Sequence, residues 1–174
     1  MPYTAVLPFF LRRSNDVVGI TEITSTSERV HGLLRLEGDR LVVQWRVARE
    51  TERVGMEIRT DHEVEPVREV VVPLAALGGA EVRATGLRRL LGPQVVLTAA
   101  DLRAFEEIAG ATGLRLAHPA ALKLRILRSD HLLAQEFAGE LNLAVAEHAL
   151  RQVEEPDYLS PAPPGRLATP PGSE

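Results

Sequence analysis

The chain has 174 residues, of which 45% are hydrophobic, and a formal net charge of −4 at pH 7. This length suffices for one ordinary domain, and the mild negative charge argues against a general nucleic-acid binder. The chain contains no cysteine, which excludes disulfides, thiol nucleophiles and cysteine-based zinc sites. The composition is compatible with the cytoplasm, where we expect the protein.

The first segment is an apolar run from Ala5 to Leu11 that Pro8 interrupts and Arg12 and Arg13 follow. A secretory signal would place the positive charge before a longer apolar run, and a transmembrane helix needs about 20 apolar residues. We expect residues 1–27 to form an N-terminal arm with an extra strand over residues 17–24. Two interpretations stay open: an arm that packs on the domain, and an arm that touches a partner or a membrane.

The clearest local signal is a β-hairpin around Gly38-Asp39. Apolar residues alternate with polar ones on both sides of this turn, which predicts two strands with one buried face and one wet face. The apolar members of this pattern are Leu34, Leu36, Leu41, Val43, Trp45 and Val47.

A charged interval follows over residues 49–69, and residues 61–66 within it read as an exposed acidic loop. The next strand, 69–74, ends at Pro73, which places it at a sheet edge or strand end because proline cannot donate to a ladder. Further strands are expected over residues 80–84, 94–98 and 122–126. Residues 100–109 change to helical spacing.

The second half ends in one long amphipathic helix over residues 129–150, whose apolar positions recur every three or four residues. That stripe consists of Leu133, Phe137, Leu141, Ala144, Val145 and His148. Ser129 or Asp130 can cap its first amides. Residues 154–174 are rich in proline and are expected to be a disordered tail.

Three stretches together resemble a bacterial pleckstrin-homology-like (PH-like) domain: the Gly-led hairpin 32–43, the strand 69–74 ending in Pro-Leu, and the strand 122–128 running into the long helix. The resemblance covers roughly residues 28–150. It implies a mainly β (α+β) fold, in which bent antiparallel sheets form a partly open barrel closed by the C-terminal amphipathic helix. The expected domain therefore spans residues 28–153.

The resemblance implies a binding scaffold and no single activity. Phosphoinositide-binding members of the family carry several basic residues along the first hairpin. Here Arg35 and Arg40 stand with Glu37 and Asp39 between them. These acids would repel a phosphorylated headgroup, which argues against specific phosphoinositide binding.

No catalytic signature, phosphate-cradling glycine loop or cofactor motif is present in the sequence, so we expect no enzyme and no cofactor. His62 lies among Asp61, Glu63 and Glu65. Such alternating acids are more often solvated than metal-binding, and no metal site is predicted.

Two groups of residues remain as candidate sites. The first is an excess of basic residues between positions 80 and 128, read either as a solvated face or as a patch for an acidic partner or anionic membrane. Its members are Arg83, Arg88, Arg89 and Arg125. The second is an apolar pocket around Trp45.

The leading hypothesis is a non-enzymatic module for protein–protein interaction or self-association. The alternatives are a carrier or sensor of a small apolar ligand or lipid, and peripheral binding to an anionic membrane.

Overall fold

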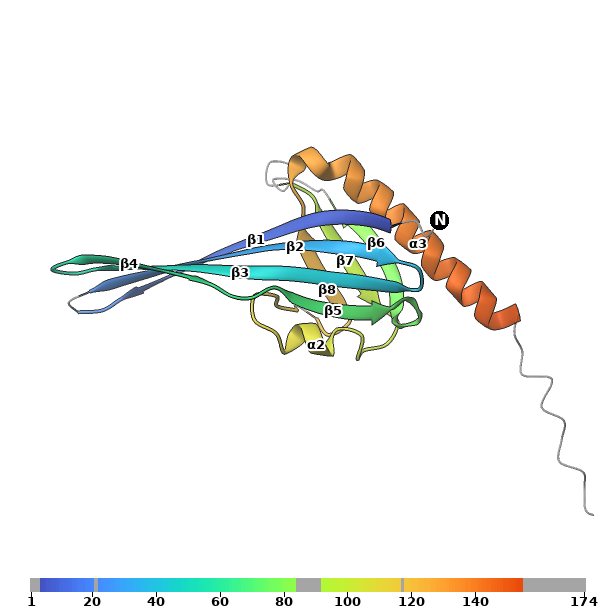
Figure 1. The fold of residues 1–174 in the computed structure, drawn as a ribbon, viewed down its shortest axis with the longest axis horizontal. Coiled ribbons are helices and arrows are strands. Elements are labelled where there is room, and N and C mark those ends of the chain that lie inside the picture. The colour runs from blue at the N-terminus through green and yellow to red at the C-terminus, as the bar shows by residue number, and fades with distance from the viewer. Residues whose placement is uncertain (1–3, 21, 84–91, 117, 155–174) are drawn as a thin grey trace, which may run out of the picture.

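A computed structural model describes residues 4–20, 22–83, 92–116 and 118–154 (Figure 1). Strands dominate these residues, and one long helix ends them, so the predicted mainly β class is confirmed. The elements are β1 (Thr4–Val18), β2 (Ile23–Glu37), β3 (Arg40–Val54), β4 (Ile58–Val64), β5 (Arg68–Pro73), η1 (Leu74–Ala76), β6 (Leu77–Arg83), β7 (Gln94–Ala99), α2 (Glu106–Ala109), β8 (Ala121–Arg125), η2 (Arg128–Asp130) and α3 (His131–Glu154).

The strands form one antiparallel sheet in the order β4-β3-β2-β1-β8-β7-β6, and β5 pairs with β3 beside β4. β1 and β8 share a single register pair, Phe10 with Arg125. The sheet bends at this corner, so β6, β7 and β8 cross behind β1, β2 and β3 (Figure 1). The bend lets both halves bury one face in a common core, and the sheet stays open.

The far halves of β1 to β3 and all of β4 project from the body as a four-stranded arm, which we define as residues 12–29 and 48–64 (Figure 1). One row across it alternates in charge: Arg13, Glu28, Arg49 and Glu63. The ion pairs along this row have N–O distances of 3.5, 3.6 and 3.2 Å. Such rows let both faces of the arm remain in water without a covering layer.

Two sequence predictions in this region need correction. The predicted acidic loop 61–66 is wrong for residues 61–64, which are exposed as expected but pair with β3 as the end of β4; only residues 65 and 66 lie outside a strand. Residues 17–24 are not one strand, because Gly19 donates to the Glu22 carbonyl at 2.8 Å and turns β1 into β2. The expected boundary at residues 27 and 28 therefore lies within β2.

The core side of the sheet is covered by the segment that carries α2. Phe105, Ile108 and Leu114 are buried there, and the Trp45 indole N–H donates to the Thr112 carbonyl at 3.0 Å. A helix over residues 100–109 was predicted, but only Glu106–Ala109 is helical. Leu102 lies before the helix begins and is 63% exposed. The helical spacing of residues 100–109 therefore did not predict which side chains of this segment are buried.

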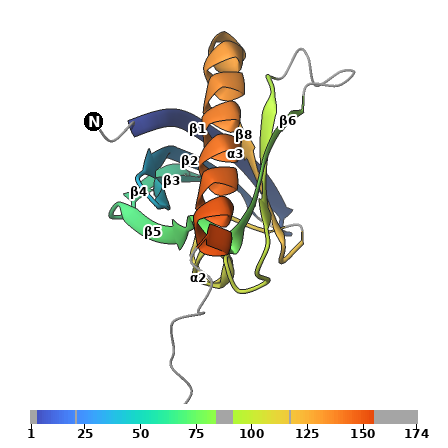
Figure 2. The same ribbon diagram turned by 90° about the vertical axis from the view of Figure 1, so that its right-hand side faces the viewer.

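The long helix α3 packs mainly against β6 and crosses the end of the body (Figure 2). Ala134, Phe137, Ala138 and Leu141 are its buried residues, whereas Leu133 is 39% exposed. Asn142 accepts a hydrogen bond from the Ala80 amide at 2.7 Å and donates one to the Ala80 carbonyl at 3.0 Å. The helix thereby satisfies part of the outer edge of β6.

Glu65, at the base of the arm, connects the arm to the segment that covers the core. Its carboxylate accepts a hydrogen bond from the Thr112 hydroxyl at 2.6 Å and pairs with Arg68 and Arg49 at 3.2 and 3.4 Å. These partners, the Thr112 hydroxyl first, lower the pKa of Glu65 below its ordinary value of 4.5, although partial desolvation opposes them.

A depressed pKa stabilises the fold at pH values above the unfolded-state pKa and ceases to do so as pH falls through the folded-state pKa. We therefore expect Glu65→Gln to be less stable than the wild type at pH 7, and the difference to shrink as pH falls below about 4.5. Urea unfolding at pH 7, 5, 4 and 3 measures this. A constant difference across that range would contradict the assignment.

Candidate functional site

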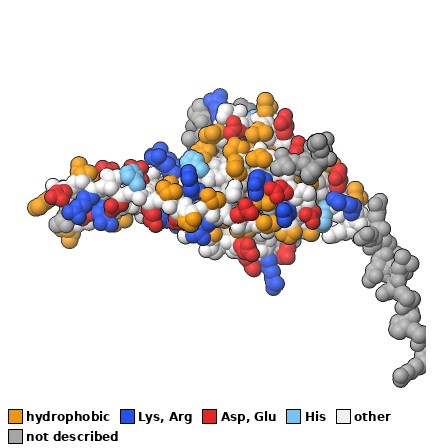
Figure 3. Space-filling view, in the orientation of Figure 1, with side chains coloured by type: hydrophobic (Ala, Val, Ile, Leu, Met, Phe, Trp, Pro, Cys, Tyr) orange, Lys and Arg blue, Asp and Glu red, His pale blue; other side chains and the backbone are white. Residues whose placement is uncertain are grey.

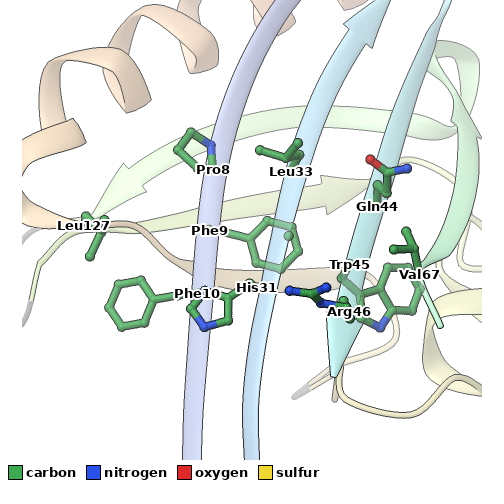
Figure 4. Close-up of a pocket in the computed structure, with 11 residues that line it drawn as sticks. Pro8, Phe9, Phe10, His31, Leu33, Gln44, Trp45, Arg46, Val67 and Leu127 are labelled. Carbon is green, nitrogen blue, oxygen red and sulfur yellow. The ribbon is translucent and has the colours of Figure 1, made fainter. Parts of the chain in front are cut away.

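The outer face of β1, β2 and β3 carries a line of functional side chains at the root of the arm. The register places Phe10 opposite His31, and His31 opposite Arg46. All three point away from the core, because their neighbours Phe9, Val30, Trp45 and Val47 are the buried ones. Figure 4 shows the three side chains in sequence across the strands.

A shallow hollow of about 450 Å³ lies on this face, within the usual size range of small-molecule sites. Pro8, Phe10 and Leu33 supply its apolar surface, and Val67 and Leu127 stand at its two sides (Figure 4). Gly32 contributes no side chain here, and the Phe9 ring occupies the core side of that glycine. The sheet therefore offers a mostly apolar depression bordered by His31 and Arg46.

Three basic side chains at or near this hollow have no partner within the described part of the chain. His31, Arg46 and Arg12 are exposed and have no hydrogen bond or ion pair with any described residue. Arg12 stands directly opposite Arg29 across β1 and β2, and Arg29 has Glu50 at 3.5 Å. Like charges directly opposite each other destabilise a sheet, so folding alone does not favour this arrangement.

We refer to these residues together as the outer-face patch. Its members are Pro8, Phe10, Arg12, Arg29, His31, Leu33 and Arg46. In Figure 3, blue basic and pale blue histidine atoms lie beside orange hydrophobic side chains where the arm joins the body.

Of the described basic residues that were predicted as a site from the sequence, only Arg125 lies next to the outer-face patch. Arg125 lies opposite Phe10 and has no partner among the described residues. Arg83 shares its row through Gln94, but its guanidinium pairs with Glu81 at 2.7 Å, and this pairing lowers the pKa of Glu81. Arg88 and Arg89 lie outside the described residues.

Trp45, predicted to mark an apolar pocket, borders the hollow but has its ring in the core. Arg29 and Arg46 were not predicted as site residues, and Arg12 was noted only as a residue that follows the N-terminal apolar run. Their alternation with buried neighbours assigns each to an outward face. Only the register of three long strands brings them together.

Metal chemistry finds no support in the described residues, which contain no group of three His, Asp or Glu side chains placed to hold an ion. His62 lies on β4 with Asp61 and Glu63 on the opposite face of the strand, because neighbouring residues alternate. None of the described helices has the length and apolar content that crossing a membrane requires.

Comparison with known proteins gives no further identification. No family model, curated protein or solved structure matches the chain.

Proposed function

We propose that this protein is a non-enzymatic, cytoplasmic binding module with PH-like architecture, and that its outer-face patch binds an acidic and apolar segment of a partner protein. The architecture is supported by the order β5-β3-β2-β1-β8-β7-β6, with a bend between β1 and β8 and a closing C-terminal helix. The bent antiparallel sheet and the closing helix are features that the PH-like resemblance implies.

The observation that carries the binding proposal is an apolar hollow bordered by His31 and by Arg46, whose guanidinium has no partner among the described residues. Arg46 and His31 stand side by side across two strands, and Phe10 adjoins His31. A guanidinium pairs with a carboxylate through two parallel hydrogen bonds. A segment with an Asp or Glu next to an apolar side chain would satisfy Arg46 and fill the hollow together.

Selection from a displayed peptide library against the full chain tests this proposal. We expect enriched peptides to combine an acidic residue with a large apolar one. Their affinity should fall about tenfold or more for Arg46→Glu, because attraction becomes repulsion in a partly desolvated contact. Isothermal titration calorimetry with a synthetic copy of the best peptide gives the dissociation constants.

Arg53→Glu is the matched control. Arg53 lies on the same strand, has no partner among the described residues and points to the opposite face. This variant should bind the peptide as the wild type does. Enrichment of peptides without acidic residues, or equal binding by Arg46→Glu, would contradict the proposal.

A second assay with the same variant distinguishes an anionic membrane from a protein partner. Vesicles of phosphatidylcholine with and without phosphatidylserine are added to the full chain in a flotation assay. Binding to the anionic vesicles that Arg46→Glu abolishes, with no peptide enriched, would favour the membrane.

A small apolar ligand is the second candidate, favoured by the size of the hollow and the proximity of Trp45. A fatty acid that fills the hollow would change Trp45 fluorescence in titration. Leu33→Glu would remove that change by placing a charge in the depression.

A further inference from the structure

The free sheet edges of this molecule differ in how they are protected. The outer edge of β6 is satisfied at Ala80 by Asn142 of α3. β4 ends the strand order on the other side, and each of its residues, from Ile58 to Val64, is exposed. A strand edge with unpaired backbone groups is a template for another strand.

The hydrogen-bond pattern shows which β4 groups face outward. The Glu65 amide donates to the Val47 carbonyl at 2.9 Å, directly beyond the last register pair of β3 and β4. In an antiparallel ladder, residues alternate between bonding to the partner strand and pointing away from it. The backbone groups of Ile58, Thr60, His62 and Val64 therefore face the open edge.

These outward groups fit a second copy of β4 in the antiparallel direction. When Asp61 lies on the two-fold axis, Thr60 stands opposite His62 of the second copy and Ile58 opposite Val64. Outward-facing backbone groups then meet outward-facing groups along the whole strand. A shift by one residue would set them against groups already bonded to β3, so only even shifts remain.

The side chains favour the same register. Ile58 and Val64 are 70% and 60% exposed and lie on the same face of β4, so pairing them across the axis removes apolar surface from water. On the other face Arg59 stands opposite Glu63 of the second copy. These two residues have exposed side chains, at 73% and 66%.

The arm portion of β1 offers no comparable match. Its Gly19 amide bonds to the Glu22 carbonyl, which leaves the backbone groups of Arg12 and Val18 facing outward by the same alternation. Pairing this whole strand with its own copy would set Arg12 opposite Val18 and Arg13 opposite Val17. Cations would then lie against exposed apolar side chains.

We propose that two copies of this chain associate through antiparallel pairing of their β4 strands, which joins the two arms into one continuous sheet. The contact is isologous, so a closed dimer forms. It lies on the edge of the arm and does not use the outer-face patch, so the failure of one proposal leaves the other standing. The Asp61 pair on the axis opposes the contact by like-charge repulsion.

Sedimentation equilibrium of the full chain over a range of micromolar concentrations tests the dimer. We expect Arg59→Glu and Glu63→Arg each to raise the dimer dissociation constant about tenfold or more, because each change creates two repulsive pairs. The double variant, Arg59→Glu with Glu63→Arg, restores opposite charges and should recover most of the wild-type association. Asp61→Asn should tighten the dimer by removing the repulsion on the axis.

Glu52→Arg makes the same charge change as Glu63→Arg one strand inward on β3, where it stands opposite Thr60, and should leave association unchanged. A wild type that remains monomeric, single variants that dimerise as the wild type does, or a double variant no better than either single one would each overturn the proposal. Mass that grows beyond the dimer would also overturn it, because β1 of one copy would then pair with β4 of the next in an open chain.

Discussion

Gly32→Ala is expected to destabilise the fold by about 3 kcal/mol or more, because a methyl group at this position has no space. A Cβ on Gly32 would overlap the Cζ atom of Phe9 and lie 2.5 Å from the Gln44 carbonyl oxygen. Phe9 is buried, and Gln44 contributes backbone of β3, which is paired on both sides by β2 and β5. Neither can move without opening the sheet or expelling an aromatic ring from the core.

Gly139→Ala is the matched control for this substitution. Gly139 lies in α3, and its added Cβ would meet nothing within 4 Å. Alanine there should stabilise the protein by roughly 0.5–1 kcal/mol, since glycine is a poor helix former. Urea unfolding followed by circular dichroism measures both variants. A loss below 1 kcal/mol for Gly32→Ala would show that the Phe9 ring has room to move.

Trp45→Ala is expected to cost about 3–5 kcal/mol, the usual range for truncating a large buried aromatic residue. The indole is 1% exposed in the core. It also donates its N–H to the Thr112 carbonyl, which holds the segment carrying α2 against the sheet. The substitution leaves both a cavity and a carbonyl without its donor.

Trp45→Phe separates these two contributions, because it keeps most of the ring and removes the N–H. We expect it to lose about 2 kcal/mol. Val71→Ala, at a 46% exposed position on β5, should stay within about 0.5 kcal/mol. Unfolding must be followed by circular dichroism, because Trp45 is the only tryptophan. Equal losses for Trp45→Phe and Trp45→Ala would assign the whole effect to the hydrogen bond.

The local geometry was accessible from the sequence wherever a short pattern settles it. Alternation around Gly38 predicted the β2–β3 hairpin, and the structure pairs Glu37 with Arg40 across that turn. The long helix and the strand end at Pro73 were also predicted. In each case neighbouring residues alone set the backbone preference.

The arm could not be predicted in this way. Neither face of β4 is buried, and its only apolar residues, Ile58 and Val64, stand at its two ends, so the strand lacks the apolar alternation that marks a half-buried strand. Asp61, His62 and Glu63 therefore read as a loop. They form a strand because β3 is long enough to pair with them and because ion pairs such as Arg49 with Glu63 replace a hydrophobic layer.

Composition and local periodicity were enough to predict the mainly β class of this protein, its β2–β3 hairpin, its closing helix and the absence of cysteine chemistry. The tertiary structure alone decided which cations share a face. Arg46 borders the hollow, and Arg12 and Arg29 lie two residues further along their strands on the same face; only the cross-strand register brings these distant residues together. The exposed edge of β4 likewise depends on the strand order. Pairing between distant segments sets that order, so no short stretch of residues predicts it.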